Sequence, residues 1–420
     1  MTASSSPVWH PFTQHALMPD ATMITRGERE WLTTPDGRGI VDAISSWWVI
    51  THGHRHPRIV EAIKMQIDRL DQVIFAGFTH EPAEQLATAL VDLAPKGLDR
   101  VFFSDSGSTA VEVAIKMALG TFHNRGEKRH RILALEHAYH GDTVGAMSAG
   151  ARGVFSNPYA PLLYEVTRIP FPRAGYEQAT IDAIDAACRK GDVAAMIVEP
   201  LILGAGGMLT YSAHTLAEMA HTVHAHGGLF IADEVMTGWG RTGTLFACEQ
   251  ANLAPDILCL AKGITGGSLP LAATLATEEI FQAHWSKDRR HTFFHSSSYT
   301  ANPVACAAAR ANCEIWQSEP VRDRIANVAA MQTQRLADLA DDADFINARQ
   351  LGTITALDLA APDAGYLADI GPKLYAFFQS RDVLLRPLGN TIYVMPPYCT
   401  EAASLDRVYD AIREAADACL

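Results

Sequence analysis

The sequence has few of the features that mark secreted, membrane-spanning or zinc-binding proteins. Its seven cysteines are an odd number without a Cys-x-x-Cys pair, which favours reduced thiols over a disulfide framework or a zinc site. It has no run of 18 or more uncharged apolar residues, so no transmembrane helix is predicted. No Lys or Arg precedes an apolar segment near the first residue, so no secretory signal is expected. We therefore expect a cytoplasmic protein with no membrane partner and no metal site.

Positive charge is also scarce. The chain has 34 Lys and Arg against 47 Asp and Glu, which gives a net charge of −13. Nucleic-acid backbones and anionic membranes are themselves negative, so neither is an expected partner. The composition, with 48% hydrophobic and 19% charged residues, is that of an ordinary globular protein. A length of 420 residues suits two or three domains, or one large domain with a smaller companion.

Short apolar runs alternate with Ala-rich helical patterns through the middle of the chain. Helices are predicted over residues 109–119 and 215–226. This alternation is typical of an α/β fold with a mostly parallel, buried sheet. The predicted strands are residues 100–103, 131–135, 195–198, 229–232, 257–260 and 271–276.

The two ends of the chain have a different pattern. Residues 1–45 contain short strands separated by turns, including the hairpin signal Pro35-Asp36-Gly37. Residues 320–420 have the pattern of a helix, short strands and a final amphipathic helix. We predict a large domain over residues 46–315 and a smaller α+β domain formed by residues 1–45 and 316–420.

A turn of small residues follows the strand predicted at residues 100–103. Gly107 allows close approach of the backbone, and Ser108 and Thr109 place hydroxyls at a helix N-terminus, where free N–H groups attract an anion. The Lys of a Walker motif is missing. The turn is therefore either a phosphate cradle of another kind or an ordinary helix cap.

Two further predicted strands end near charged residues. Asp233 follows residues 229–232, and Lys262 lies just after residues 257–260, before a glycine-rich stretch. Ligands of open α/β sheets bind at the carboxyl ends of strands, where burial lowers the pKa of a lysine and frees its amine for Schiff-base chemistry. Each residue alone fits a cap or a salt bridge. A phosphate cradle, an acid and a lysine in this order favour pyridoxal phosphate, whose pyridine nitrogen needs an acidic partner.

Longer segments resemble a known family. The segments SDSGSTAVEVAIKMA (104–118), IADEVMTGWGRTG (231–243) and LAKGITGG (260–267) resemble class III aminotransferases, which are pyridoxal-phosphate enzymes of fold type I. Within that class the chain resembles the branch that acts in biotin biosynthesis. The segments that carry this second resemblance are WHPFTQ (9–14), SSWWVITHGHRHP (45–57), AYHGDTVGAMS (138–148), LFACEQANLAPDILCLAKGITGG (245–267) and LRPLGNTIYVMPPY (385–398).

The resemblance implies an α/β fold type I transferase with pyridoxal 5'-phosphate as cofactor. It implies that Lys262 forms the Schiff base and moves the proton, and that Asp233 pairs with the pyridine nitrogen. Gly107 and Ser108 would bind the phosphate, and Tyr139 would stack on the ring. The implied reaction converts 8-amino-7-oxononanoate to 7,8-diaminononanoate, with S-adenosylmethionine as amino donor.

The resemblance also implies a homodimer with shared active sites. Ser298 matches a family threonine whose hydroxyl reaches the phosphate from the partner subunit. Ser297 is assigned to the cofactor and Ser296 to the substrate, although the three serines replace a more usual Gly-Pro/His-Thr. The hydroxyl is kept at Ser298, whereas the family's backbone contacts at residues 296 and 297 do not carry over directly.

The substrate pocket implied by the resemblance is aromatic with one cation. Tryptophan faces suit an aliphatic chain, a sulfonium and an adenine, and a guanidinium suits a carboxylate. Phe12 stands where relatives that use adenosylmethionine usually have tyrosine, so L-lysine remains an alternative donor. The implied substrate-binding residues are Phe12, Trp47, Trp48, Tyr139, Lys262, Ser296, Arg386 and Tyr393.

Three other functions remain open. A general ω-amine or diamine transaminase is disfavoured by the Trp47-Trp48 pair and the segment 385–398. An aminomutase would need no external acceptor, and a non-catalytic cofactor-binding protein would not need Lys262. The histidines at 52, 54 and 56 are interpreted as part of a structural or substrate-lining loop, and those at 221, 224 and 226 as solvent-exposed residues of a helix, rather than as metal ligands.

Overall fold

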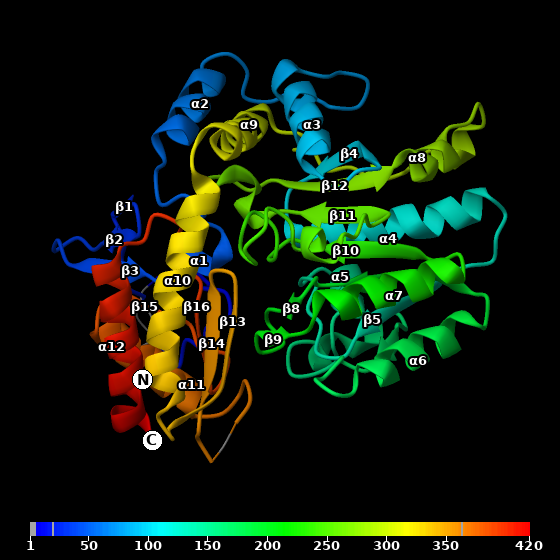
Figure 1. Ribbon diagram of the computed structural model, residues 1–420. Helices are drawn as coiled ribbons and strands as arrows, with labels where there is room; N and C mark the ends of the chain where they lie inside the picture. The colour runs from blue at the N-terminus through cyan, green and yellow to red at the C-terminus, as the bar shows by residue number, and fades with distance from the viewer. Residues whose placement is uncertain (1–5, 19–20, 363) are drawn as a thin grey trace.

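A seven-stranded sheet lies at the centre of the larger of two units in the computed structural model, which describes residues 6–18, 21–362 and 364–420 (Figure 1). One strand, β12, runs antiparallel to both of its neighbours, and the other neighbouring strands pair in parallel. In spatial order the strands are β4 (Leu98–Ser104), β12 (Ala272–Thr277), β11 (Ile257–Leu260), β10 (Leu229–Asp233), β7 (Val193–Val198), β5 (Arg131–Leu135) and β6 (Thr167–Ile169).

Helices cover both faces of this sheet. Alternate residues of β11 belong to different core clusters, with Ile257 and Cys259 on one face and Leu258 and Leu260 on the other. This two-sided burial explains why the strands are continuous apolar runs in the sequence. One face is covered by α4 (Gly107–Asn124), α5 (Val144–Ala149) and α8 (Glu278–His284), and the other by α3 (Glu81–Leu93), α6 (Glu177–Cys188), α7 (Ala213–Ala225) and α9 (Pro303–Ser318).

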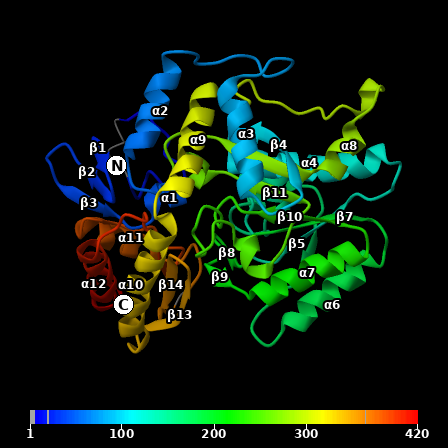
Figure 2. The ribbon, with the colours of Figure 1, turned by 45° about the horizontal axis from the view of Figure 1, so that its top comes forward.

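Both ends of the chain build the second unit. Figures 1 and 2 show the C-terminal helix α12 beside the N-terminal strands. Val41 and Ile44 share a core cluster with Leu405 and Val408 of α12. The unit contains β1 (Arg26–Glu28), β2 (Trp31–Thr33), β3 (Gly39–Asp42) and β15 (Val383–Leu384), the antiparallel sheet of β13 (Phe345–Leu351), β14 (Ile354–Leu359) and β16 (Thr391–Val394), and the helices α10 (Val321–Ala340), α11 (Ile370–Ser380) and α12 (Ala402–Cys419).

Shorter elements connect the two units. The four-residue turn α1 (Ser45–Trp48) follows β3, and α2 (Pro57–Ile67) packs against α9. A two-stranded hairpin of β8 (Ile202–Leu203) and β9 (Leu209–Thr210) follows β7. The remaining elements are short 3-10 helices: η1 (Asn157–Leu162), η2 (Ala247–Ala251), η3 (Lys262–Thr265) and η4 (Arg289–His291).

The structure confirms the α/β fold class with a mostly parallel sheet. Two predicted strands, residues 131–135 and 257–260, coincide with β5 and β11, and the predicted hairpin at Pro35-Asp36-Gly37 joins β2 to β3. The antiparallel direction of β12 was not predicted. The domain boundaries at residues 46 and 315 stay a prediction.

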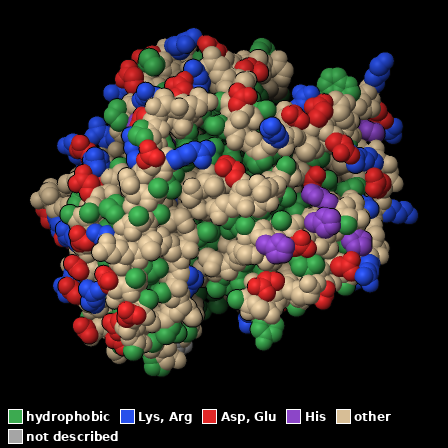
Figure 3. Space-filling view, viewed as in Figure 1, with side chains coloured by type: hydrophobic (Ala, Val, Ile, Leu, Met, Phe, Trp, Pro, Cys, Tyr) green, Lys and Arg blue, Asp and Glu red, His purple; other side chains and the backbone are tan. Residues whose placement is uncertain are grey.

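The surface carries charges of both signs without a large patch of either on the face in Figure 3. Histidines gather over α7 on this face, and His214, His221 and His224 are exposed residues of that helix. The carboxylate of Asp256 accepts a hydrogen bond from Nε2 of His224 at 2.7 Å. Among the residues that the structure describes, no helix is long and apolar enough to cross a membrane.

Ile231→Ala tests the core beneath the strand that carries Asp233. Ile231 is fully buried in β10, so removing its outer carbons should lower the free energy of unfolding by roughly 2–5 kcal/mol. Ile346→Ala in β13 is the control, because Ile346 is 48% exposed. Urea unfolding followed by circular dichroism measures both losses, and equal losses would contradict the described packing.

Candidate active site

A cavity of about 420 Å³ lies at the carboxyl ends of the parallel strands. It brings together six of the predicted site residues, which come from segments far apart in the sequence. The edge of the sheet that the sequence predicted as the binding site is therefore where the cavity is found. These six lining residues are Trp48, Gly107, Ser108, Tyr139, Asp233 and Lys262.

Lys262 begins the 3-10 helix η3 directly after β11. Its φ of 46° lies in the left-handed region, which is uncommon for a residue with a side chain and concentrates at functional sites. Desolvation lowers the pKa of the amine, while the nearby carboxylates of Asp233 and Glu199 raise it by a smaller amount. The Nζ atom lies 5.2 Å from the centre of the Trp48 ring. A lysine in these surroundings releases its proton more readily than one in water.

Asp233 ends β10 and is anchored by two donors. Its Oδ2 lies 2.6 Å from Nδ1 of His140, and its Oδ1 accepts the N–H of Val235 at 3.1 Å. His140 and Asp233 are both buried, and Nε2 of His140 has no hydrogen-bond partner within the described part of the chain. Sequence reasoning missed His140, because nothing local to residue 140 indicates a partner 93 residues away.

Glu199 is a second buried carboxyl group beside the cavity. Its two oxygens accept the N–H groups of Tyr139 and Gly204, each at 2.9 Å, and burial raises its pKa to about 7. The Tyr139 hydroxyl donates to Oδ1 of Asp142 at 3.0 Å, and burial raises the pKa of this phenol, so it stays protonated. Glu199 follows β7 as Asp233 ends β10, so the strand-end rule would have found it.

The N-terminus of α4 faces the cavity. Ser106 and Thr109 form a capping box, with Thr109 N–H donating to Ser106 Oγ at 3.2 Å and Ser106 N–H to Thr109 Oγ1 at 2.9 Å. The amides of Gly107 and Ser108 lie in the first turn, where a helix offers no intrahelical acceptor. A Cβ on Gly107 would lie 2.6 Å from Cγ1 of Val235, so only glycine fits there. This turn can receive an anion.

Of the predicted substrate-binding residues in the second unit, Trp48 lines this cavity, whereas Trp47 and Arg386 line a separate one. Trp48 Nε1 donates to the hydroxyl of Tyr393 at 3.1 Å, and burial raises the pKa of Tyr393. The Arg386 guanidinium lies 5.0 Å from the centre of the Trp47 ring and donates to the carbonyl of Phe12 at 2.8 Å. Phe12 meets Trp47 edge to face, with ring centres 5.6 Å apart. The structure thus gathers three predicted substrate-binding residues, Phe12, Arg386 and Tyr393, around the Trp-Trp pair.

The Trp-Trp pair is held on an unusual turn. All four residues of α1, Ser45 to Trp48, have positive φ, with values of 53°, 47°, 77° and 75°. A left-handed turn of residues with side chains costs roughly 1–2 kcal/mol per residue. Trp48 is buried against the cavity, whereas Trp47 is 37% exposed.

The three predicted serines do not line this cavity, although Ser297 contacts Asp105, which does. Ser296 and Ser298 are exposed, and Ser297 is partly buried. The Ser297 hydroxyl donates to the carboxylate of Asp105, and the Ser298 carbonyl accepts from Gln72 Nε2 at 2.7 Å. None of the three lines the cavity within the part of the chain that the structure describes.

Comparison with known proteins gives matches over nearly the whole chain. The chain is 48% identical to an adenosylmethionine-8-amino-7-oxononanoate aminotransferase of Synechococcus elongatus, with 98% of each chain covered. A relative of the same name from Geobacter sulfurreducens is 35% identical, with 97% of this chain and 95% of the relative covered.

Solved structures of aminotransferases also match nearly the whole chain. An adenosylmethionine-8-amino-7-oxononanoate aminotransferase of Methanocaldococcus jannaschii matches with a TM-score of 0.93 and 33% identity, covering 98% of this chain and 97% of the other. A PLP-bound amine transaminase from an uncultivated Pseudomonas species matches with a TM-score of 0.92 and 31% identity, covering 99% of both chains.

The family model for aminotransferase class-III matches residues 13–416. This match spans the strand-end residues Asp233 and Lys262, the helix N-terminus at Gly107 and the aromatic wall. The chain belongs to the class III aminotransferase family, and the predicted family and fold type are confirmed.

Proposed function

We propose that this chain transfers an amino group from S-adenosylmethionine to 8-amino-7-oxononanoate, which yields 7,8-diaminononanoate for biotin synthesis. The observation that carries the proposal is the cavity that brings Lys262, Asp233 and Trp48 together, while the adjacent Trp47 lines a second cavity with Arg386, whose guanidinium lies over its ring. The names of the relatives from Synechococcus elongatus and Geobacter sulfurreducens support the same reaction.

The cofactor of the proposal is pyridoxal 5'-phosphate, and the residues around the cavity fit its chemistry. The first turn of α4, with Gly107 and Ser108, suits the phosphate, because free amides and the helix dipole favour an anion. Asp233, held by His140, suits a protonated pyridine nitrogen, and the ring of Tyr139 suits stacking. When bound, the cofactor supplies a carbonyl for the amino group and a ring that spreads negative charge.

Lys262 carries the proton in the proposed mechanism. Its Nζ would hold the cofactor at rest and, once free, would accept the proton from the substrate Cα and carry it to the neighbouring carbon that the cofactor supplies. A lowered pKa favours the neutral form of the amine that this step needs. Asp233 is held in place by two hydrogen bonds, which it accepts from His140 and the Val235 amide.

The aromatic wall and Arg386 bind the substrates in this proposal. The aliphatic chain of 8-amino-7-oxononanoate packs against Trp47 and Trp48, and its carboxylate pairs with Arg386. The sulfonium of S-adenosylmethionine is stabilised by cation–π contact with the tryptophan rings. Phe12 contributes an apolar ring that contacts Trp47. It offers the substrate no hydroxyl for a hydrogen bond. A general amine transaminase is the second candidate, which the likeness to the Pseudomonas enzyme favours.

We also propose a homodimer that completes the phosphate site, in a cytoplasmic setting. Phe294 and Tyr299, which flank the three serines, are 70% and 64% exposed, as expected of a surface covered by a second copy. Ser298 lies outside the cavity of its own chain and would reach the cavity of the partner. The seven free cysteines support a reducing compartment.

A donor panel tests the reaction. Purified protein loaded with cofactor is mixed separately with S-adenosylmethionine, L-lysine and putrescine, and the absorbance of the bound cofactor is followed through one turnover. We expect S-adenosylmethionine to convert the cofactor to its aminated form. Conversion by L-lysine alone would move the protein to the lysine-using branch, and conversion by putrescine alone would favour a general amine transaminase.

Mixed dimers test the roles of Lys262 and Ser298 together. Lys262→Ala should fold and lower kcat by at least about 10²–10⁴-fold, because the proton carrier is lost. Ser298→Ala should weaken cofactor binding roughly 10-fold or more, because a hydrogen bond to a phosphate is removed.

The heterodimer of the two variants, purified with two affinity tags, should regain one site with normal turnover and tight cofactor binding. In that dimer Lys262 of one protomer and Ser298 of the other serve the same site. A heterodimer without any normal site would show that Ser298 does not cross to the partner.

A further inference from the structure

The left-handed turn α1 needs to be held by its surroundings. Four consecutive residues with side chains adopt positive φ, and two of them are tryptophans. Backbone in this region is retained only where neighbouring groups determine it, and it clusters where strain serves function. The groups that hold α1 therefore determine the orientation of the Trp47 and Trp48 side chains.

Asp42 forms two hydrogen bonds with Ser46, a central residue of the turn. It is fully buried at the end of β3. Its Oδ1 accepts the N–H of Ser46 at 2.7 Å, and its Oδ2 accepts the Ser46 hydroxyl at 2.7 Å. Nε2 of His54 lies 2.8 Å from the same Oδ2, and the His54 side chain is only 13% exposed. Asp42 thus fixes the residue at the centre of the turn, and His54 fixes Asp42.

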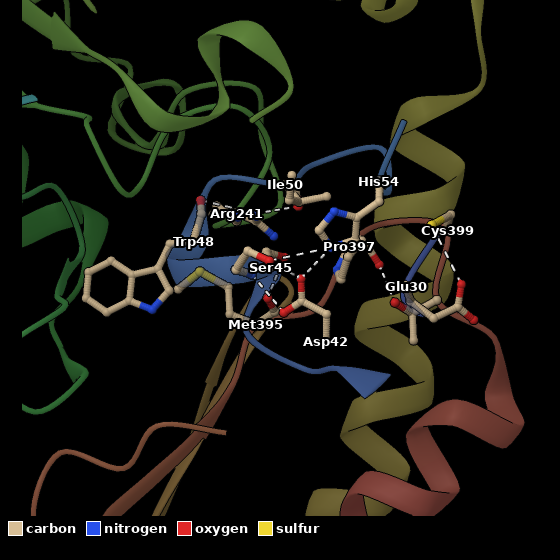
Figure 4. Close-up of polar contacts among 12 residues, drawn as sticks. Glu30, Asp42, Ser45, Trp48, Ile50, His54, Arg241, Met395, Pro397 and Cys399 are labelled. Atoms are coloured by element: carbon tan, nitrogen blue, oxygen red, sulfur yellow. Dashed lines mark hydrogen bonds and ion pairs between the residues drawn. The ribbon is translucent and has the colours of Figure 1, made fainter. Parts of the chain in front are cut away.

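Two other segments bind the ends of the turn. Ser45 Oγ donates to the carbonyl of Met395 at 2.8 Å. The buried guanidinium of Arg241 donates to the carbonyls of Trp48 at 3.3 Å and Ile50 at 2.9 Å. Figure 4 shows this arrangement, with Arg241 next to Trp48 and Ile50 and the His54 ring reaching toward Asp42. The turn is held from the N-terminal strand, the C-terminal segment and the larger unit.

We propose that Asp42 and His54 are positioning residues that hold α1 left-handed and thereby set the orientation of Trp47 toward the substrate. Neither residue lines the cavity that holds Lys262, so they act through the turn. The inference rests on the proposed function, because the substrate role of Trp47 is part of that proposal.

The test compares two substitutions of His54 with a matched control. His54→Ala removes the donor to Asp42, and His54→Gln offers an amide N–H near the position of Nε2. His226→Ala is the control, because His226 makes a contact of the same 2.8 Å with Asp185 between α7 and α6, away from the cavity.

We expect His54→Ala to raise KM for 8-amino-7-oxononanoate roughly 10-fold or more while kcat changes little, because a misplaced wall weakens binding rather than proton transfer. His54→Gln should return KM to near the wild-type value, and His226→Ala should leave it unchanged. In a Trp47→Ala background, His54→Ala should have no further effect on KM, because the two residues act as one unit.

A second readout needs neither cofactor nor substrate. Hydrogen–deuterium exchange of the peptide spanning residues 42–50 in the cofactor-free protein should be faster in His54→Ala than in wild type, and unchanged in His226→Ala. Wild-type exchange in His54→Ala, or additive effects with Trp47→Ala, would overturn the proposal. If the wild-type enzyme fails to turn over the keto acid, the proposed function fails instead, and the exchange measurement still tests the turn.

Discussion

The proposed chemistry depends on burying one amine and two carboxyl groups together at the carboxyl edge of the sheet. Desolvation lowers the pKa of Lys262, while Asp233 and Glu199 oppose that shift. An unpaired buried charge would be costly, and hydrogen bonds to the two carboxyl groups offset part of that cost. His140 anchors Asp233, and main-chain amides anchor Glu199. The parallel strands matter because they deliver these distant residues to one edge.

The proposed substrate wall is built by different means from the strand-end cluster of Lys262, Asp233 and Glu199. It stands on short irregular segments from both ends of the chain, with Trp48 bonded to Tyr393 and Trp47 beneath Arg386. Such segments tolerate sequence change better than a buried sheet does, which suits a surface that determines specificity. The buried Arg241 links this wall to the larger unit through the carbonyls of residues 48, 50 and 396.

Much of the sheet and of the strand-end cluster could be predicted from the sequence, because buried parallel strands are apolar runs that end at the ligand site. Asp233 and Lys262 were found by that rule, and Glu199 could have been. The direction of β12 could not, because a strand's direction depends on its connections rather than on its residues. The contact between His140 and Asp233 and the left-handed turn at Ser46 also escaped prediction, because long-range partners determine both.

The most direct test of the central claim is the titration of Lys262 in the cofactor-free protein. Brief labelling with a small amine-specific reagent over a range of pH, followed by mass spectrometry of the peptide that contains Lys262, gives the pKa of its amine. The account predicts a midpoint below the ordinary value of 10.5, because desolvation outweighs the attraction of Asp233 and Glu199. A midpoint at or above 10.5 would contradict it, since the amine would then be held as a cation by its neighbours.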